Sequence, residues 1–183
     1  MSDGKPADAG AQPTSAGPAL RLARWTVTSS SNAQSRGAVV IDAGKHHWRA
    51  SAEGNGAVDA LFKAVDAALA EVLEGHPKLT GYDVHSLGEG PDAEGLVMVA
   101  IEPPAGLEGG RSAGLYQGKS RSTNIIAASI DGYIEALNAM LAEAHWAGAA
   151  ETAGHGRRAT PEAHGRRAER DPNAKDSVPW FDG

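Results

Sequence analysis

The feature of the sequence that most restricts the fold is a glycine turn, Gly54-Asn55-Gly56, that leads directly into an amphipathic helix. The apolar residues after it follow the i, i+3, i+4 spacing of one helical face: Val58, Leu61, Phe62, Val65, Leu69, Val72 and Leu73. Glycine allows close approach, and the first N–H groups of a helix lack partners within it, so such a turn can seat a carboxylate or a phosphate. A tight turn with ordinary packing is the alternative. It is favoured by Asp59, which already supplies negative charge at the helix start.

A second stretch, Gly118 to Ile126, again runs from a glycine-led loop into a helix. One side of that helix carries Ile125, Ile126, Ser129, Ile130, Tyr133, Ile134, Leu137, Met140 and Leu141. We expect Ser122 or Thr123 to cap it, since a hydroxyl oxygen can accept a hydrogen bond from the exposed N–H groups. Strand-like apolar alternation precedes both units, which predicts an internal duplication.

Three stretches of strand character precede each helix. They are residues 20–28, 38–42 and 46–52 in the first unit, and 82–87, 94–102 and 111–117 in the second. We expect the first helix to end near Glu74, with Gly75 as its cap and Pro77 preventing continuation, and the second to run to about Ala147. The prediction is an α+β fold of two pseudo-symmetric β-β-β-α units, with the sheets packed with two helices.

Both ends of the chain have compositions that cannot form a core. Residues 1–18 and 147–183 consist largely of small, polar and charged residues, so buried surface cannot offset their ordering entropy. We therefore expect two disordered tails around a domain of residues 19–146. His-Gly-Arg-Arg-Ala recurs at 155–159 and 164–168, but neighbouring acids balance the arginines, which favours a solvated segment over a phosphate-binding one. Trp180 and Phe181 are either a short docking peptide or an end without a role.

Charge and composition exclude several classes of function. The net charge of −6 offers no basic field for nucleic acid, and the absence of cysteine excludes disulfides and cysteine metal sites. The first twenty residues lack the pattern of a secretory signal, and no apolar run is long enough to cross a bilayer. We expect a cytoplasmic protein that binds neither nucleic acid nor membrane.

The sequence offers little for catalysis or metal binding. His46 and His47 are the obvious metal candidates, but adjacent side chains on a strand point to opposite faces and cannot easily chelate one ion. No G-x-S-x-G, P-loop or H-E-x-x-H pattern occurs, and Ser120, Ser122 and Thr123 fit caps and helix-face hydroxyls better than nucleophiles. We predict no catalytic residue, no metal and no cofactor.

Several motifs, taken in order, resemble the C-terminal regulatory domain of 2-isopropylmalate synthase and the similar domain of (R)-citramalate synthases. They are Gly54-Asn55-Gly56-x-Val58-Asp59-Ala60-Leu61, Tyr82-x-Val84, Gly90-x-Asp92-Ala93, Ser122-Thr123-Asn124-Ile125-Ile126-x-Ala128-Ser129, and Tyr133 with Ala136-Leu137-Asn138. The resemblance covers about Leu20 to Glu143. It implies a pseudo-twofold, a homodimer, and feedback inhibition by an end-product amino acid, leucine in the synthase, bound near the dimer interface.

Carried over position by position, the resemblance implies an effector site in both units. Its residues are Gly54, Asn55, Gly56, Val58 and Asp59 in the first, and Ser122, Thr123, Asn124 and Ile125 in the second. Two positions depart from the family. Ala57 replaces the proline usual after the first G-x-G, which makes the helix start less rigid, and the second copy reads Gly118-Lys119-Ser120 where G-x-G is common.

Leucine would have to be held at both of its charged groups. An apolar slot contributes roughly 1.5–3 kcal/mol, whereas micromolar affinity needs about 8 kcal/mol. Helix-start N–H groups would hold the carboxylate, and Asp59 or Asp92 would accept the ammonium.

The catalytic part of the synthase is a TIM barrel, which typically needs about 250 residues, and this chain does not supply one. We therefore predict a stand-alone regulatory module, not itself an enzyme, that controls a separately encoded acyltransferase of leucine biosynthesis. Two alternatives stay open. One is a scaffolding dimer without a working pocket, and the other is a small enzyme of specialised metabolism that reuses the fold's cavity.

Overall fold

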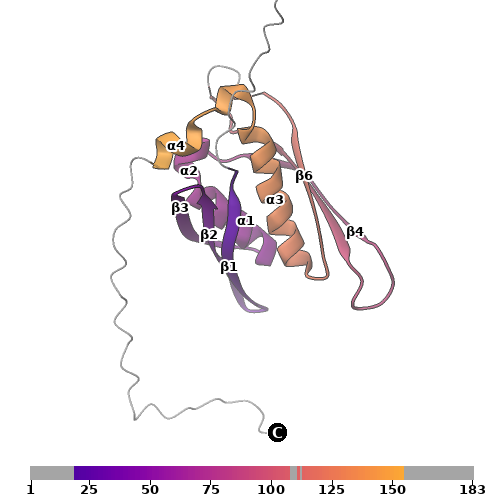
Figure 1. Ribbon diagram of the computed structural model, residues 1–183. Coiled ribbons are helices and arrows are strands. Elements are labelled where there is room, and N and C mark those ends of the chain that lie inside the picture. Colours follow the sequence, from indigo (N-terminus) through magenta and orange to yellow (C-terminus); the bar gives the residue numbers. More distant parts are fainter. Residues whose placement is uncertain (1–18, 108–110, 112, 155–183) are drawn as a thin grey trace, which may run out of the picture.

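The computed structural model describes residues 19–107, 111 and 113–154. Within them the chain forms two three-stranded antiparallel sheets and a set of helices in the order β-β-β-α, β-β-β-α. Figure 1 shows the two sheets on either side of helix α3. The predicted α+β class and duplication are confirmed.

The first unit comprises strands β1 (Arg21–Ser30), β2 (Ala33–Ala43) and β3 (His46–Gly54), followed by helix α1 (Ala57–Ala68). The sequence predicted one helix to Glu74, but the structure interrupts it at Leu69 and continues with a single turn, α2 (Ala70–Leu73). The left-handed residue that ends this turn is Glu74 (φ 54°), and not Gly75 as predicted.

The second unit comprises β4 (Lys78–Ser86), β5 (Gly95–Glu102), β6 (Tyr116–Ser122) and α3 (Ile125–Leu141). The sixth strand therefore begins and ends later than the predicted 111–117, and Gly118–Ser120 lies inside a strand instead of a turn. The reason is steric. A Cβ atom at Gly118 would overlap the backbone of Gly132 and Ala136, so this glycine lets β6 approach α3 closely.

The edge strand pairs with the central strand in the same register in both sheets, and this shows which residues of the two units correspond. On β1, Leu22, Trp25 and Val27 pair with Ile41, Val39 and Gly37; on β4, Leu79, Tyr82 and Val84 pair with Ile101, Val99 and Val97. Both edge strands have an irregularity at the same place, after Leu22 and after Leu79, and β1 has a second one after Thr28.

This correspondence corrects the predicted alignment of the two glycine turns. Gly54 pairs with Ser35 in the first sheet, and Ser122 pairs with Gly95 at the matching position of the second. The counterpart of Gly54-Asn55-Gly56 is therefore Ser122-Thr123-Asn124, whereas Gly118-Lys119-Ser120 matches residues within β3.

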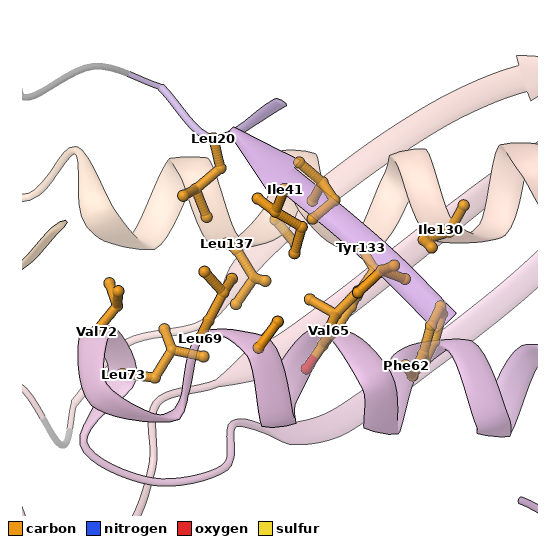
Figure 2. Close-up of a cluster of buried hydrophobic side chains, with 14 of the residues drawn as sticks. Leu20, Ile41, Phe62, Val65, Leu69, Val72, Leu73, Ile130, Tyr133 and Leu137 are labelled. Carbon is orange, nitrogen blue, oxygen red and sulfur yellow. The ribbon is translucent and has the colours of Figure 1, made fainter. Parts of the chain in front are cut away.

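The core lies between the sheets, where α1 and α3 pack against each other and against their own strands. Residue numbers rise in the same direction along both helices in Figure 2, so the helices run parallel and begin at the same end. The rings of Phe62 and Tyr133 stack across the helix pair at a centroid distance of 4.4 Å. The fully buried members include Leu61, Val65, Leu69, Ile130, Leu137 and Met140.

The chain continues past α3 into a short 3-10 helix, η1 (Ala144–Trp146), and helix α4 (Ala149–Gly154). Trp146 and Ala150 are buried, and α4 packs on α2, so the folded part extends beyond residue 146, where we expected a tail. Residues 1–18 and 155–183, with the arginine repeat and Trp180-Phe181, lie outside the described residues. Among those that are described, no single helix is long and apolar enough to span a bilayer, and α3 passes that test only when joined to residues 144–153 across a 95° bend.

Candidate effector site at the helix starts

The first predicted group of site residues forms the junction between β3 and α1. Gly54 is buried, and a Cβ atom there would lie 2.5 Å from the backbone nitrogen of Ala60, so glycine is required for close packing at this point. Gly56 precedes the helix in an extended conformation (φ −154°) and provides no side-chain cap. A Cβ atom built on Gly56 would meet nothing within 4 Å, so the helix start is open on this side. Val58 is half-buried against the core.

Asp59 supplies the negative charge of this junction. Its Oδ2 accepts hydrogen bonds from the backbone nitrogen of Asn55 (2.8 Å) and from Nζ of Lys63 (2.8 Å). The bond from Lys63 lowers the pKa of Asp59 against the opposing effect of partial burial, and the bond from Asn55 lowers it further. The start of α1 therefore combines an ionised carboxylate with N–H groups that no side chain caps.

The second group forms the junction between β6 and α3, and there the structure corrects the predicted cap. The cap is Asn124, whose Oδ1 accepts from the backbone nitrogens of Ile126 (3.1 Å) and Ala127 (3.2 Å). Ser122, the last residue of β6, instead accepts from the backbone nitrogen of Asn124 (3.0 Å). Thr123 is exposed, and the side chain of Ile125 packs over Gly95. This helix start is neutral and capped, unlike that of α1.

Residues outside the predicted site link the two helices at their second turns. Tyr82 on β4 places its ring edge-on to Phe62 of α1 (6.2 Å between centroids), and its Oη lies 2.6 Å from Oγ of Ser129 on α3. Since Ser129 donates its proton to the carbonyl of Ile125 (2.6 Å), Tyr82 is the donor to Ser129. The sequence signal for Ser129 was a hydroxyl on an otherwise apolar helical face. Asp92, the other acid suggested for the ammonium, is exposed in the turn between β4 and β5.

A second unpredicted polar pair joins the helices further along. Oη of Tyr133 on α3 donates to Oδ1 of Asp66 on α1 at 2.5 Å, and Nδ1 of His76 lies 3.9 Å from the other carboxylate oxygen. Burial raises the pKa of Asp66 to about 6, against the opposing effects of the Tyr133 hydrogen bond and of His76. Burial also raises the pKa of Tyr133, and the neighbouring Asp66 raises it further. Figure 2 shows Tyr133 between Val65 and Ile130, within the apolar core.

The two adjacent histidines of β3 have different neighbours. The ring of His46 lies 5.8 Å from that of Trp48, whereas Nδ1 of His47 lies 2.7 Å from Oδ1 of Asp42. Across the described part of the chain, no group of three histidine or acidic side chains could hold a metal ion.

Comparison with known proteins identifies the family. The model of the LeuA allosteric (dimerisation) domain matches residues 10–141. The 2-isopropylmalate synthase of Salinibacter ruber (strain M8) is 32% identical over 126 residues, which cover 68% of this chain and 21% of the relative. That of Sediminispirochaeta smaragdinae is 40% identical over 89 residues (49% of this chain, 15% of the relative), and that of Nitrosococcus oceani 32% over 122 residues (67% and 22%).

The chain thus spans about a fifth or less of the length of these relatives. The matched residues include both β-β-β-α units, in the order that the fold shows. This chain belongs to the LeuA allosteric (dimerisation) domain family, and it corresponds to the regulatory domain of 2-isopropylmalate synthases.

Proposed function

We propose that this chain is a homodimeric regulatory module of the cytoplasm that binds leucine or a similar small amino acid. In doing so it controls a separate acyltransferase of the 2-isopropylmalate synthase type in branched-chain amino acid biosynthesis. The observation that carries the proposal is the start of α1, where N–H groups without a side-chain cap lie beside the ionised Asp59. A free amino acid carries the two complementary charges close together.

The chemistry of binding follows from this junction. The ligand carboxylate lies over the open backbone at Gly56, where the first N–H groups and the helix dipole attract negative charge. The ligand ammonium shares or replaces the bond from Lys63 to Asp59, which is partly exposed. Both contacts are needed, because the apolar side chain supplies only roughly 1.5–3 kcal/mol of the binding free energy.

Regulation by such a ligand requires two states of the protein that bind it differently. The family description as a dimerisation domain supports a second copy as the structural element that changes. The neutral, capped start of α3 is less suited to an amino acid than that of α1. We therefore place the ligand at the start of α1, the helix whose second turn contacts the second sheet through Phe62 and Tyr82.

Titration calorimetry with leucine, isoleucine and valine tests binding. We expect a saturable signal for the native chain that is lost in Gly56→Trp, because the indole fills the open space at the helix start. Lys45→Trp is the matched control, since Lys45 is exposed in the turn between β2 and β3, at the other end of the first sheet. Asp59→Asn should weaken binding by about tenfold or more through loss of the ammonium contact. Absence of a signal for all three amino acids refutes the effector proposal.

The regulatory target is tested separately. We expect the chain to co-purify with a barrel-only synthase and to make its activity sensitive to the amino acid that the calorimetry identifies. Association without that sensitivity would instead support a scaffolding dimer, and turnover by the isolated chain would support a small enzyme.

A further inference from the structure

Strand β4 exposes an unusual amount of apolar surface. Four of the five large apolar side chains that are exposed in the described residues lie on β4 or directly after it: Leu79, Tyr82, Val84 and Leu87. We call Leu79, Tyr82 and Val84 the β4 apolar face. In Figure 1, β4 runs along the outer margin of the molecule, on the side away from the first sheet.

The β4 apolar face is on the inner side of its sheet. Leu79, Tyr82 and Val84 lie directly opposite Ile101, Val99 and Val97, which are fully buried, and directly opposed residues share a face of the sheet. These three positions therefore carry core-type residues that are covered only in part, because α3 packs on β5 and β6. Leu79 and Val84 remain 46% and 44% exposed.

The internal repeat provides a standard for comparison. The counterparts of the three residues on β1 are Leu22, Trp25 and Val27, which have the same pairing register. Those three are partly buried and pack against the core. The same positions of the same repeat are thus covered in the first unit and open in the second.

From this difference we infer that the β4 apolar face is the apolar centre of the contact between two copies of this chain. The inference rests on the homodimer of the proposed function and deepens it by naming the surface. A second copy is the occupant that the family description as a dimerisation domain supports. The irregularity between Leu79 and Gly81 interrupts the edge ladder, so we expect side chains of the two faces to pack against each other instead of a continuous sheet forming.

A twofold contact of this kind has two consequences. Each substitution acts twice, because the same patch contributes from both copies. Tyr82 also contacts Phe62 of α1 and Ser129 of α3, so the dimer contact lies beside the second turn of each helix.

Sedimentation equilibrium of the full chain tests the inference with Leu79→Glu and Val84→Lys. We expect the dissociation constant of the dimer to rise roughly 100-fold or more in either variant. Leu115→Glu is the matched control, because Leu115 is an exposed leucine (58%) next to β6, at the opposite edge of the same sheet, and should leave the constant unchanged. Circular dichroism checks that each variant remains folded.

A milder substitution guards against variants that unfold. The chain has no cysteine, so Leu79→Cys and Leu115→Cys each introduce a single thiol. Labelling of the thiol at position 79 should slow at least tenfold as protein concentration rises through the dimerisation range, whereas labelling at position 115 should not.

The outcomes separate the two proposals. If the dimer persists in both Leu79→Glu and Val84→Lys, and labelling does not depend on protein concentration, the β4 apolar face is not the dimer contact. The homodimer of the proposed function is then unaffected. Slow labelling at position 79 at every concentration would show that another part of the same chain covers the face, which also overturns the inference. A native chain that is monomeric throughout refutes both the surface and the homodimer.

Discussion

The phenol oxygen of Tyr133 on α3 lies 2.5 Å from Oδ1 of Asp66 on α1, and this hydrogen bond joins the two central helices within an apolar core. The ring of Tyr133 also stacks on Phe62, so one residue provides both a polar and an apolar contact between the units. Because burial raises the pKa of Asp66 to about 6, the pair links the stability of the helix interface to pH.

The direction of that pH dependence follows from the pKa. Between about pH 4, the pKa of an unfolded aspartate, and about pH 6, the pKa of Asp66 in the folded chain, the folded state holds a proton that the unfolded state has lost. The contribution of Asp66 to stability is therefore greatest below about pH 4, falls through this window by about 3 kcal/mol at most, and is constant above it.

Asp66→Asn should remove this component, since an amide oxygen can still accept from Tyr133 and carries no charge. We expect the unfolding free energy of the variant to exceed that of the native chain by about 1–3 kcal/mol at pH 7.5 and by much less at pH 4.5. Urea unfolding at both values measures the difference. Asp83→Asn, at an exposed position of β4, is the control, and an equal effect of Asp66→Asn at both pH values would contradict the prediction.

Removing the side-chain cap of α3 and adding one to α1 should have opposite effects on stability. Asn124→Ala should cost about 1 kcal/mol of stability, because the backbone nitrogens of Ile126 and Ala127 lose their acceptor. Gly56→Asn should stabilise the chain by a few tenths of a kcal/mol by providing α1 with the cap it lacks. Thermal unfolding compares the two, and a loss of stability in Gly56→Asn would show that the cap geometry of α3 does not transfer to α1.

Two glycines that face each other across β6 and α3 should respond differently to alanine. Gly118→Ala would place a methyl group against the backbone of Gly132 and Ala136, so we expect a loss of about 3 kcal/mol as strand and helix separate. At Gly132 the nearest atom to a new Cβ is Cγ2 of Val99 at 3.4 Å, an ordinary contact. Gly132→Ala should therefore be neutral or stabilising by up to about 1 kcal/mol, since alanine favours the helix. Denaturant midpoints of the two variants test the contrast, and similar midpoints would count against it.

Asn138 fixes the beginning of the described chain to α3. Its Oδ1 accepts from the backbone nitrogen of Leu20 (2.7 Å), and its Nδ2 donates to the carbonyl of Leu20 (2.9 Å). In Asn138→Ala we expect β1 to open locally, with hydrogen exchange at Leu20 faster by about tenfold or more, while the exchange of β5 amides stays unchanged. Equal acceleration in both strands would indicate global destabilisation instead.

Patterns of short range were sufficient to predict the duplicated units and the buried face of α1. Apolar periodicity also located five of the strands, because a strand with one face on the inner side of its sheet alternates apolar and polar side chains whether or not that face is fully covered. The boundaries of β6 were wrong for a physical reason: Gly118 looks like a turn residue, and only its approach to Gly132 shows that it is a packing residue. Similarly, the alanine-rich residues of α4 have the composition of a tail, and burial against α2 is what distinguishes them.

The polar contacts between the helices could not be predicted from the sequence. Asp66 and Tyr133, like Tyr82 and Ser129, are far apart in the chain, and no local pattern pairs them. The nine predicted effector residues lie at two helix starts at the same end of the fold, and their role in binding stays a prediction.

The two hydrogen bonds between Leu20 and Asn138 also fix where the described chain begins relative to the helix starts. Asn138 lies near the C-terminal end of α3, about 20 Å along the helix axis from the cap at Asn124. A protein segment joined ahead of Leu20 would thus attach at the opposite pole of the molecule from a ligand at the helix starts. Because α3 spans this distance as one continuous helix, a shift or tilt of α3 as a rigid body would carry a small displacement from the ligand to the far pole without unfolding the chain between them.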